Sequence, residues 1–482
     1  MISTKFIKSS LIYSLIGSLP LFSGFILLPF YTNLLSTADF GNLTLYVSIT
    51  FAVQVLANFG FDSYIGVYYY DCKNDKQKLK DNIGTVVASL VIIGAGLTLI
   101  SLFLGEPLFN VLFRDSSLSF FPYGLMSVLT GIFNSFFRTY ANLLVNQQKP
   151  ERFFWVNSFN FAITILISLA GIFLYPYTLI GPMWGRLLSG VLIFILALYF
   201  FIHEFGFRIK KELFKTILNF CLPLLAYSAL LWIVNYIDRF IINDYFNPTE
   251  VAIYDFGLKC IIVVDFFQNG LTAAIYPKVF DIWVNNTSRT STVEVNRYFS
   301  GFTAVSILLI PFVIFIMPLA LPAIITNKDF YIAFGFLPLL AVQFVFRGLM
   351  SMYLAPVYFY KKTKVLPIVF FIAAVLQVGL GIFLIRQLGI MGAVWTLVII
   401  KPVQVLLLYF ASNRYYHFKI NLLKFILLPL LFSAFIVAIY FLPLFTQPHL
   451  NNLAILAFSV IIVSIAYRNE VRLLVRQLLQ KK

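Results

Sequence analysis

The sequence predicts an all-α polytopic membrane protein with about fourteen transmembrane helices. Hydrophobic residues make up 61% of the 482 residues and charged residues only 11%, and the mean hydropathy is +0.91. This composition is too apolar for a soluble chain of this length. Apolar runs of about 20 residues, the length that crosses a bilayer as a helix, recur along the whole chain between short polar segments.

The apolar runs place the expected spans in order along the chain. They are residues 9–32, 43–66, 83–105, 119–144, 154–174, 180–202, 216–242, 251–275, 299–324, 333–357, 365–385, 390–411, 422–443 and 450–467. The last two runs are interrupted, so twelve or thirteen spans stay open as alternatives. The first run is too long for the apolar region of a signal peptide and has no small-residue cleavage site after it, so we expect a retained helix.

The net charge of +16 predicts the orientation of these helices. If the N-terminus is cytoplasmic, 26 of the 35 Lys and Arg residues fall in cytoplasmic segments, three fall outside and six fall within spans. The positive-inside rule therefore predicts that both termini are cytoplasmic. We interpret the excess charge as a topology signal and an attraction to anionic lipid, not as a nucleic-acid-binding domain.

The basic C-terminal tail has the spacing of a surface helix. Arg468, Arg472 and Arg476 follow one another at i, i+4 and i+8 beside leucines. This pattern predicts an amphipathic helix on the inner leaflet, with a contact to a protein partner as the alternative.

Cysteine and histidine usage predicts no disulfide, metal or cofactor. The six residues are far apart, without a C-x-x-C pair, and are Cys72, Cys221, Cys260, His203, His417 and His449. The chain also contains no D-x-D, no H-E-x-x-H and no glycine-rich phosphate loop. We therefore expect that the protein is not an enzyme.

An internal repeat divides the chain. Gly171-Ile-Phe, then "GPMWGRLL" and "LYF" at 198–200, recurs as Gly381-Ile-Phe, "GAVWTLVI" and "LYF" at 408–410. The sequence predicts two six-helix lobes at 1–210 and 211–420, with two further helices and the basic tail at 421–482. An even number of spans makes the repeats parallel, as in transporters whose substrate site lies between the halves near the midplane. Chance similarity between apolar helices is the alternative.

Six basic residues fall within the predicted spans, against four acids. The cations are Arg138, Arg186, Arg239, Lys259, Arg347 and Lys401, and the acids are Asp62, Asp238, Asp255 and Asp265. A charge at the centre of a membrane helix costs about 2.5–3.5 kcal/mol on insertion scales, and such residues usually face the interior, pair with another charge or mark a pathway. The surplus predicts an anionic ligand, because guanidinium groups bind phosphate oxygens in a bidentate manner.

Arg138 and Arg347 are the strongest candidates for binding that ligand. They lie 209 residues apart, at corresponding places in the two repeats. At i−4 and i+4 around them stand Asn134 and Asn142 in one repeat, and Gln343 and Ser351 in the other. Neither arginine has an acid in its own span, which favours a functional role. Interhelical ties to carbonyl groups and snorkelling toward the cytoplasmic side are the alternatives.

The remaining intramembrane charges also have structural interpretations. Asp255 and Lys259 are spaced at i and i+4, so they can neutralise each other. Arg239 lies near a span end, where it can pair with a neighbouring acid or snorkel. For Asp62 a capping or interfacial role is the favoured interpretation, with coupling to a proton or Na⁺ as the alternative. Candidates for polar lining or ion coupling are Asn134, Asn142, Gln343, Asp62 and Asp255.

Two stretches resemble a known family. "LPLLAYSALLWIVNYIDRFIINDYFNPTEVAIYDFGLK" at 222–259 resembles the opening of the second half of polysaccharide flippases (Wzx-like, polysaccharide transporter family) of the multidrug/oligosaccharidyl-lipid/polysaccharide exporter superfamily. The first-half match is "LPFYTNLLSTADFGNLTLY" at 28–46. The resemblance covers nearly the whole chain and implies a MATE-like fold of two six-helix bundles around a central cationic cavity.

The resemblance also implies a function. It implies a bacterial inner-membrane protein that flips an undecaprenyl-pyrophosphate-linked oligosaccharide by alternating access, with a polysaccharide polymerase as a candidate partner. Nothing between Ser9 and Thr37 is charged, unlike in the related lipid II flippases, which favours an O-antigen, capsule or exopolysaccharide unit. A small-molecule antiporter of the same superfamily and a membrane-embedded glycan-processing enzyme are the alternatives.

Overall fold

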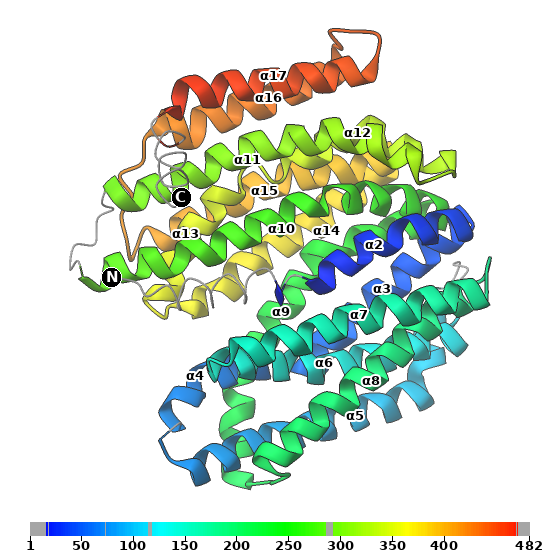
Figure 1. The fold of residues 1–482 in the computed structure, drawn as a ribbon, viewed down its shortest axis with the longest axis vertical. Coiled ribbons are helices and arrows are strands. Elements are labelled where there is room, and N and C mark those ends of the chain that lie inside the picture. Colours follow the sequence, from blue (N-terminus) through cyan, green and yellow to red (C-terminus); the bar gives the residue numbers. More distant parts are fainter. Residues whose placement is uncertain are drawn as a thin grey trace. The chain divides into compact units, whose positions relative to one another are not determined.

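The computed structural model describes residues 16–17, 19–72, 74–113, 118–285, 293–468 and 470, and these contain helices but no β-strand (Figure 1). Because lipid offers no partner for backbone N–H and C=O groups, an apolar chain must satisfy them within helices. The long helices are α2 (Leu19–Leu34), α3 (Thr37–Asn58), α4 (Phe61–Cys72), α5 (Lys76–Leu112), α6 (Leu125–Asn146), α7 (Pro150–Leu174), α8 (Ile180–Phe205), α9 (Lys211–Tyr245), α10 (Pro248–Asn285), α11 (Val293–Ala320), α12 (Ile332–Val342), α13 (Arg347–Phe359), α14 (Leu366–Leu388), α15 (Ile390–Ser412), α16 (Leu428–Phe441) and α17 (Pro448–Ala466). Short helical segments are η1 (Phe120–Gly124), η2 (Leu321–Ala323), η3 (Lys328–Tyr331), η4 (Thr363–Val365) and η5 (Leu423–Leu427).

The predicted multi-pass helical fold is confirmed. Among the described residues, 11 helices are long and apolar enough to cross a membrane, and the pair formed by η3–α12 and α13, bent by 42°, makes a twelfth. Helices α2 and α10 lie in two further predicted spans but are not among these. The count of fourteen therefore stays a prediction. Residues 9–15 of the first span and the predicted tail helix beyond Glu470 lie outside the described residues.

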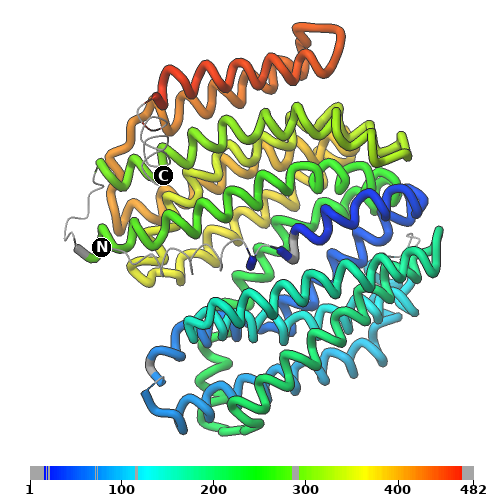
Figure 2. The backbone as a smooth tube through the Cα atoms, in the orientation of Figure 1, coloured from blue at the N-terminus to red at the C-terminus, as the bar shows by residue number. Residues whose placement is uncertain are grey.

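The chain packs as two compact units, which can be followed in Figure 2. We call residues 26–252 the N unit, and residues 253–482 together with those up to Phe25 the C unit. In the N unit α9 packs against α3, α4 and α5, although the sequence repeat places it in the second lobe. In the C unit α11 packs against α12, α13 and α17. The lobes 1–210 and 211–420 describe the sequence repeat and stay a prediction.

Each unit contains a helix hairpin in which glycine allows two backbones to touch. Helices α7 and α8 lie side by side in the N unit (Figure 1). A Cβ on Gly181 would lie 2.3 Å from the carbonyl oxygen of Gly171. In the α14–α15 hairpin of the C unit, a Cβ on Gly392 would lie 2.2 Å from the carbonyl oxygen of Leu384. Small residues of this kind let membrane helices pack closely, and both hairpins belong to the segments that repeat in the sequence.

Breaks in two predicted spans place candidate site residues. Between α3 and α4, Phe59 and Gly60 adopt left-handed φ angles of 51° and 82°, which glycine tolerates without a Cβ penalty. The break puts Asp62 in the first turn of α4. In the C unit, residues 343–346 separate α12 from α13, and Arg347 is the first residue of α13.

A buried glutamine stabilises the second of these breaks. Gln268 on α10 is fully buried, and its Nε2 donates hydrogen bonds to the carbonyl oxygen of Phe344 at 3.0 Å and to Oγ of Ser306 at 2.8 Å. Interrupted helices are tolerated within membranes where neighbouring side chains satisfy the freed backbone groups. Gln268 supplies this function from a neighbouring helix.

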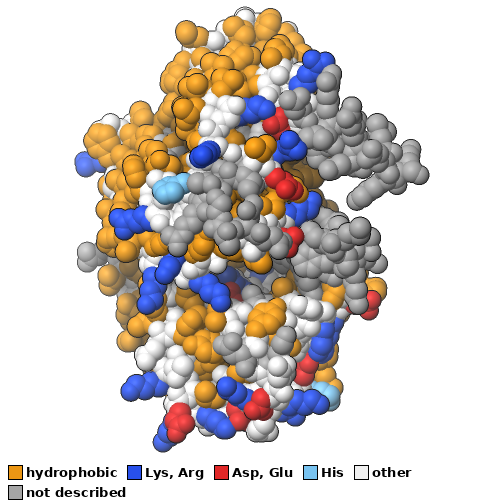
Figure 3. Space-filling model, turned by 90° about the vertical axis from the view of Figure 1, so that its left-hand side faces the viewer, with side chains coloured by type: hydrophobic (Ala, Val, Ile, Leu, Met, Phe, Trp, Pro, Cys, Tyr) orange, Lys and Arg blue, Asp and Glu red, His pale blue; other side chains and the backbone are white. Residues whose placement is uncertain are grey.

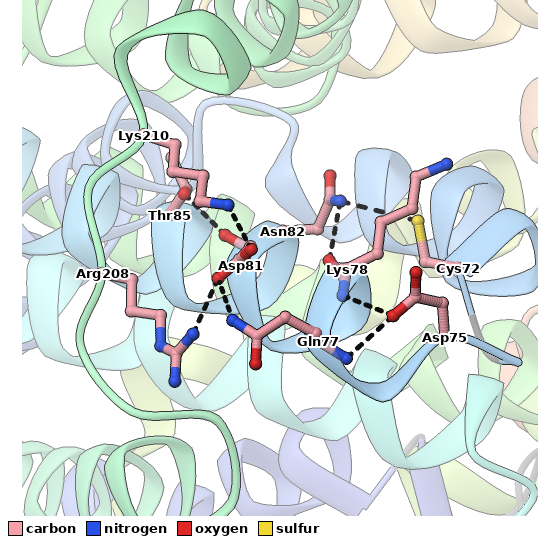
Figure 4. Close-up of polar contacts among 9 residues, drawn as sticks. All are labelled: Cys72, Asp75, Gln77, Lys78, Asp81, Asn82, Thr85, Arg208 and Lys210. Atoms are coloured by element: carbon pink, nitrogen blue, oxygen red, sulfur yellow. Dashed lines mark hydrogen bonds and ion pairs between the residues drawn. The ribbon is translucent and has the colours of Figure 1, made fainter.

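An ionic cluster in the N unit ties the segment after α8 to the beginning of α5 (Figure 4). Asp81 on α5 is 4% exposed. It accepts a hydrogen bond from Nη1 of Arg208 at 2.8 Å and a second from Nζ of Lys210. Both basic side chains reach Asp81 from the same non-helical segment. The buried carboxylate therefore fixes the chain between α8 and α9.

A second cluster in the N unit has the same composition. Glu204 near the end of α8 pairs with Nζ of Lys149 at 2.8 Å and with Nη1 of Arg152 at 3.4 Å. Each cluster thus joins one acid to two basic residues.

Lys and Arg side chains also gather on the face shown in Figure 3. A net positive charge of this kind attracts anionic lipid headgroups.

The two C-terminal helices pack against other helices of the C unit, α17 against α11 and α16 against α12. Lys424 donates to both carboxylate oxygens of Glu470, at 2.7 and 3.0 Å, and Ser300 donates to one of them at 3.0 Å. Burial alone would raise the pKa of Glu470, but these hydrogen bonds outweigh it and lower the pKa below its usual range. The carboxylate therefore stays ionised near neutral pH and holds the beginning of η5–α16 to the end of α17.

We expect Gly181→Ala to lower the free energy of unfolding by about 1–3 kcal/mol, the usual cost of overpacking, because the new Cβ would meet the Gly171 backbone. The thermal unfolding midpoint of the purified protein in detergent measures this loss. Gly96→Ala on α5 is the matched control, since nothing lies within 4 Å of the added Cβ. It should leave the midpoint unchanged or raise it through better helix propensity. Equal destabilisation by both substitutions would contradict the close contact.

Candidate functional site

Arg138 and Asp62 form an ion pair between two helices of the N unit. Nε of Arg138 on α6 donates to Oδ2 of Asp62 on α4 at 3.1 Å. The arginine side chain is 50% exposed and the aspartate side chain 14%. Asn134 and Asn142 are half-buried on the same side of α6, whereas the residues that flank Arg138 are buried. The polar stripe predicted from the spacing therefore lies on the open side of α6.

The C unit holds a corresponding pair with a third member. Nη2 of Arg347 donates to Oδ1 of Asn269 at 2.8 Å and lies 3.4 Å from Oδ1 of Asp265. Asn269 in turn donates to Oδ2 of Asp265 at 2.9 Å. The Arg347 and Asp265 side chains are 32% and 25% exposed. Asn269 thus fixes both charged groups while leaving them partly accessible.

Helix α10 carries a polar stripe that faces α13 in the C unit. Oγ1 of Thr272 lies 3.1 Å from Oγ of Ser351, and the Tyr276 hydroxyl donates to the Ser351 carbonyl oxygen at 2.9 Å. With Asp265 and Asn269 these residues follow one another at i, i+4, i+7 and i+11 along one side of α10. The sequence-based prediction missed the stripe, although its helical spacing is visible in the sequence.

The two ion pairs occupy matching places in the repeat. Asp265 follows Asp62 by 203 residues, and Arg347 follows Arg138 by 209. In each unit the aspartate belongs to the second predicted span of its repeat and the arginine to the fourth. Each arginine is therefore paired although its own span contains no acid, because its partner lies on another helix.

Two other predicted site residues pair with an acid that lies close to them in sequence. Nη1 of Arg239 lies 3.0 Å from Oδ1 of Asp238, and their side chains are 8% and 2% exposed. Arg239 also donates to the carbonyl oxygen of Asn235 at 2.8 Å. Nζ of Lys259 pairs with Oδ2 of Asp255 at 2.8 Å. The structure confirms that Arg239 pairs with a neighbouring acid and that Asp255 neutralises Lys259. In both pairs the basic residue has a structural role, which is to balance a nearby carboxylate.

The remaining predicted residues are placed separately. Arg186 lies on α8 beside Tyr31, and no described hydrogen bond or ion pair links it to the Asp62–Arg138 pair. Lys401 is half-buried on α15. Gln343 follows the end of α12, where its Nε2 donates to the Leu340 carbonyl oxygen at 3.0 Å. Each of the four intramembrane aspartates pairs with a different cation among the described residues.

The two exposed pairs have the chemistry of an oxyanion site. A guanidinium group has five N–H donors and no acceptor. Arg138 uses only its Nε–H on Asp62 in the described contacts, so donors remain for a ligand. Arginine binds phosphate or carboxylate oxygens through parallel hydrogen bonds. Among the described residues no group of three His, Cys, Asp or Glu side chains is arranged to hold a metal ion.

Comparison with known proteins gives a family match and one curated relative. A family model described as "Polysaccharide biosynthesis protein" matches residues 6–283. The chain is similar to "Lsg locus putative protein 1" of Haemophilus influenzae, with 23% identity over 291 residues. This alignment covers 58% of the chain and 66% of the relative, just under two thirds of its length.

Solved structures with a similar fold extend over most of the chain. A lipid II flippase MurJ in an inward closed conformation has a TM-score of 0.73 at 19% identity and covers 95% of this chain and 99% of its own. An inward-facing multidrug resistance MATE family transporter of the MOP superfamily has a TM-score of 0.62 at 14% identity, with 86% and 98% covered. An outward-facing MATE family transporter has a TM-score of 0.56 at 16% identity, with 85% and 94% covered. At such identities the likeness shows the fold alone.

Burial separates the two classes of ion pair in a measurable way. We expect Arg239→Gln to cost about 3–5 kcal/mol of stability, because it removes the positive charge that Arg239 places beside the buried Asp238. Arg138→Gln should cost at most about 1 kcal/mol, because half of this side chain is exposed. The thermal unfolding midpoints of the two purified variants measure the effect of the same substitution in a buried pair and in an exposed pair. A larger loss for Arg138→Gln would contradict the assignment of Arg138 to an open site.

Proposed function

Since the chain belongs to the polysaccharide biosynthesis protein family, we propose that it flips a lipid-linked oligosaccharide across the bacterial inner membrane by alternating access. Two observations support this proposal. The helical fold is that of transporters of the MOP superfamily. The similar structure with a TM-score of 0.73 is that of a lipid II flippase. In this proposal both termini are cytoplasmic, as the distribution of Lys and Arg predicts.

The proposed substrate is an undecaprenyl-pyrophosphate-linked oligosaccharide, such as a repeat unit of O-antigen, capsule or exopolysaccharide. Its head group combines an anionic diphosphate with uncharged or weakly charged sugars. The observation that carries the proposal is the presence in each repeat of one partly exposed arginine, Arg138 or Arg347, oriented by an aspartate. The absence of charge between Ser9 and Thr37 favours this substrate class over a peptidoglycan precursor.

In this mechanism each aspartate holds the guanidinium group of its partner while the site is empty. A phosphate oxygen then competes with the carboxylate of Asp62 or Asp265 for the same N–H donors. Phosphate has the advantage of bidentate geometry and a higher charge. The displaced carboxylate is then left without the cation that it binds in the empty site. The pairs thereby offer a route to couple substrate binding to ion movement.

A small-molecule antiporter is the second function that this fold can support. The fold similarity to multidrug resistance transporters is its basis. A cationic drug would meet six intramembrane cations and only four acids in this chain, a balance that repels it. An anionic substrate is therefore favoured over a cationic drug.

The proposed protein partner is a polysaccharide polymerase, which would use the flipped product.

We expect Arg138→Ala or Arg347→Ala to reduce flipping at least about tenfold, since each removes charge-assisted hydrogen bonds to the diphosphate. The assay measures which leaflet exposes the lipid-linked oligosaccharide in cells depleted of the native protein. The complete unit should accumulate on the cytoplasmic face and be exported again with the wild type. Arg386→Ala, an exposed arginine of α14, is the matched control and should restore export.

Three results would count against the proposal. Normal periplasmic delivery in depleted cells would reject flipping of this lipid and favour the antiporter. An incomplete glycan would indicate an enzyme. Full export by both arginine variants and by the double variant, at normal membrane levels, would remove Arg138 and Arg347 from the mechanism while leaving the transport function open.

A further inference from the structure

The segment between α8 and α9 exposes two apolar side chains. Residues 206–210 form no helix, and the backbone of Lys210 is extended, with φ −109° and ψ 112°. Successive side chains of an extended chain point to opposite sides. Phe207 and Ile209, two residues apart, are 50% and 54% exposed. The segment therefore has an apolar side that the rest of the chain leaves uncovered.

The other side of the segment is cationic and is fixed to the protein. Arg208 and Lys210 both bind the buried carboxylate of Asp81 (Figure 4), yet their side chains stay 40% and 55% exposed. A guanidinium group has five N–H donors and an ammonium group three. One carboxylate therefore leaves one positive charge uncompensated, with further donors for a ligand, at a partly open position.

The segment lies where the chain leaves the membrane. Helices α8 and α9 are both long and apolar enough to cross a bilayer, so the short connection between them lies at a membrane surface. Gly206 ends α8 with φ 77° and ψ 179°, a conformation that glycine adopts without a Cβ penalty. The side chains of Phe207 and Ile209 are therefore within reach of lipid.

A second cationic cluster adjoins the segment. Glu204, two residues before the segment begins, pairs with Lys149 and Arg152, whose side chains are 41% and 31% exposed. This cluster also leaves one positive charge uncompensated. Tyr199 and Ile202, on the same end of α8, are exposed apolar residues. Surplus positive charge and exposed apolar side chains thus occur together along this end of the N unit.

This combination matches the chemistry of an anionic phospholipid. The phosphate group offers oxygens to the basic side chains, and the acyl chains offer an apolar environment to the exposed hydrophobic residues. We propose that residues 206–210 bind an anionic phospholipid, with Arg208 and Lys210 on its phosphate and with Phe207 and Ile209 inserted among the acyl chains. This proposal does not depend on the proposed transport function.

The buried carboxylate of Asp81 distinguishes this site from diffuse attraction between a basic protein and a membrane. Long basic side chains lose rotamer freedom when they bind a ligand, which lowers affinity. Arg208 and Lys210 are already ordered by Asp81. A lipid phosphate therefore meets preorganised donors, and we expect tighter binding here than at an isolated surface lysine.

The test places a tryptophan reporter, Phe207→Trp, in the full-length protein in lipid nanodiscs. Lipids with brominated acyl chains quench a tryptophan that they contact, and the signal of the wild type, which has five tryptophans, is subtracted. We expect brominated phosphatidylglycerol, diluted into unlabelled phosphatidylcholine, to quench the reporter. Half-quenching should need a mole fraction at least about fivefold lower than with brominated phosphatidylcholine, the effect of one cation near the surface.

Two controls separate the headgroup contact from apolar insertion. In the reporter protein, Arg208→Gln with Lys210→Gln should remove most of the preference for phosphatidylglycerol. Arg386→Gln, at an exposed arginine of α14, should leave the preference unchanged. Because loss of both cations from Asp81 could prevent folding, raised salt provides a check that needs no further substitution. It screens the exposed charges, so the preference should shrink while quenching persists.

Three results would overturn the proposal. Absence of quenching by both brominated lipids would place the segment outside the membrane and leave Phe207 and Ile209 for a protein partner. Equal quenching by the two lipids would show apolar insertion without headgroup selectivity. A preference that survives in a folded variant without Arg208 and Lys210 would place the anionic lipid elsewhere.

Discussion

The cost of an unpaired charge in a low-dielectric interior is the constraint on which the rest of this structure depends. Each intramembrane aspartate is matched to a cation, but in two different ways. Asp238–Arg239 and Asp255–Lys259 are close in sequence and satisfied locally. The pairs of Arg138 and Arg347 span two helices each and remain partly exposed. A pair of residues close in sequence only removes the cost of an unpaired charge. A pair formed between two helices can also break or re-form when those helices move or when a ligand binds.

Much of the fold follows from composition and periodicity, because a lipid environment leaves the backbone few choices. The multi-pass helices and the counterpart relation of Arg138 and Arg347 could be predicted in this way. The partners of these arginines could not, since spacing within one span carries no information about which face of a neighbouring helix it meets. Packing of α9 with the earlier helices was equally hidden, because a sequence repeat records ancestry and not contact.

The breaks in two helices determine where the charged residues of the candidate site lie. The left-handed Phe59–Gly60 step orients Asp62, and the interruption before Arg347 places that residue at a helix beginning. Helix beginnings carry partial positive charge from unpaired N–H groups, which reinforces the attraction of Arg347 for anions. Gln268 stabilises the second interruption by donating a hydrogen bond to the carbonyl oxygen of Phe344. Irregular backbone is thus confined to places where a neighbouring side chain or a polar ligand can meet it.

The internal neutrality of the two exposed pairs has an electrical consequence. With Asp62 bound to Arg138 and Asp265 to Arg347, each empty site carries no net charge. In the proposed cycle the membrane voltage, negative inside, would then act mainly on the loaded protein, through the charge of the diphosphate. Each elementary charge that crosses the full field gains about 2.3 kcal/mol per 100 mV. Outward movement of an anion is favoured and the empty return is nearly voltage-independent, so the resting potential alone would give the cycle its direction.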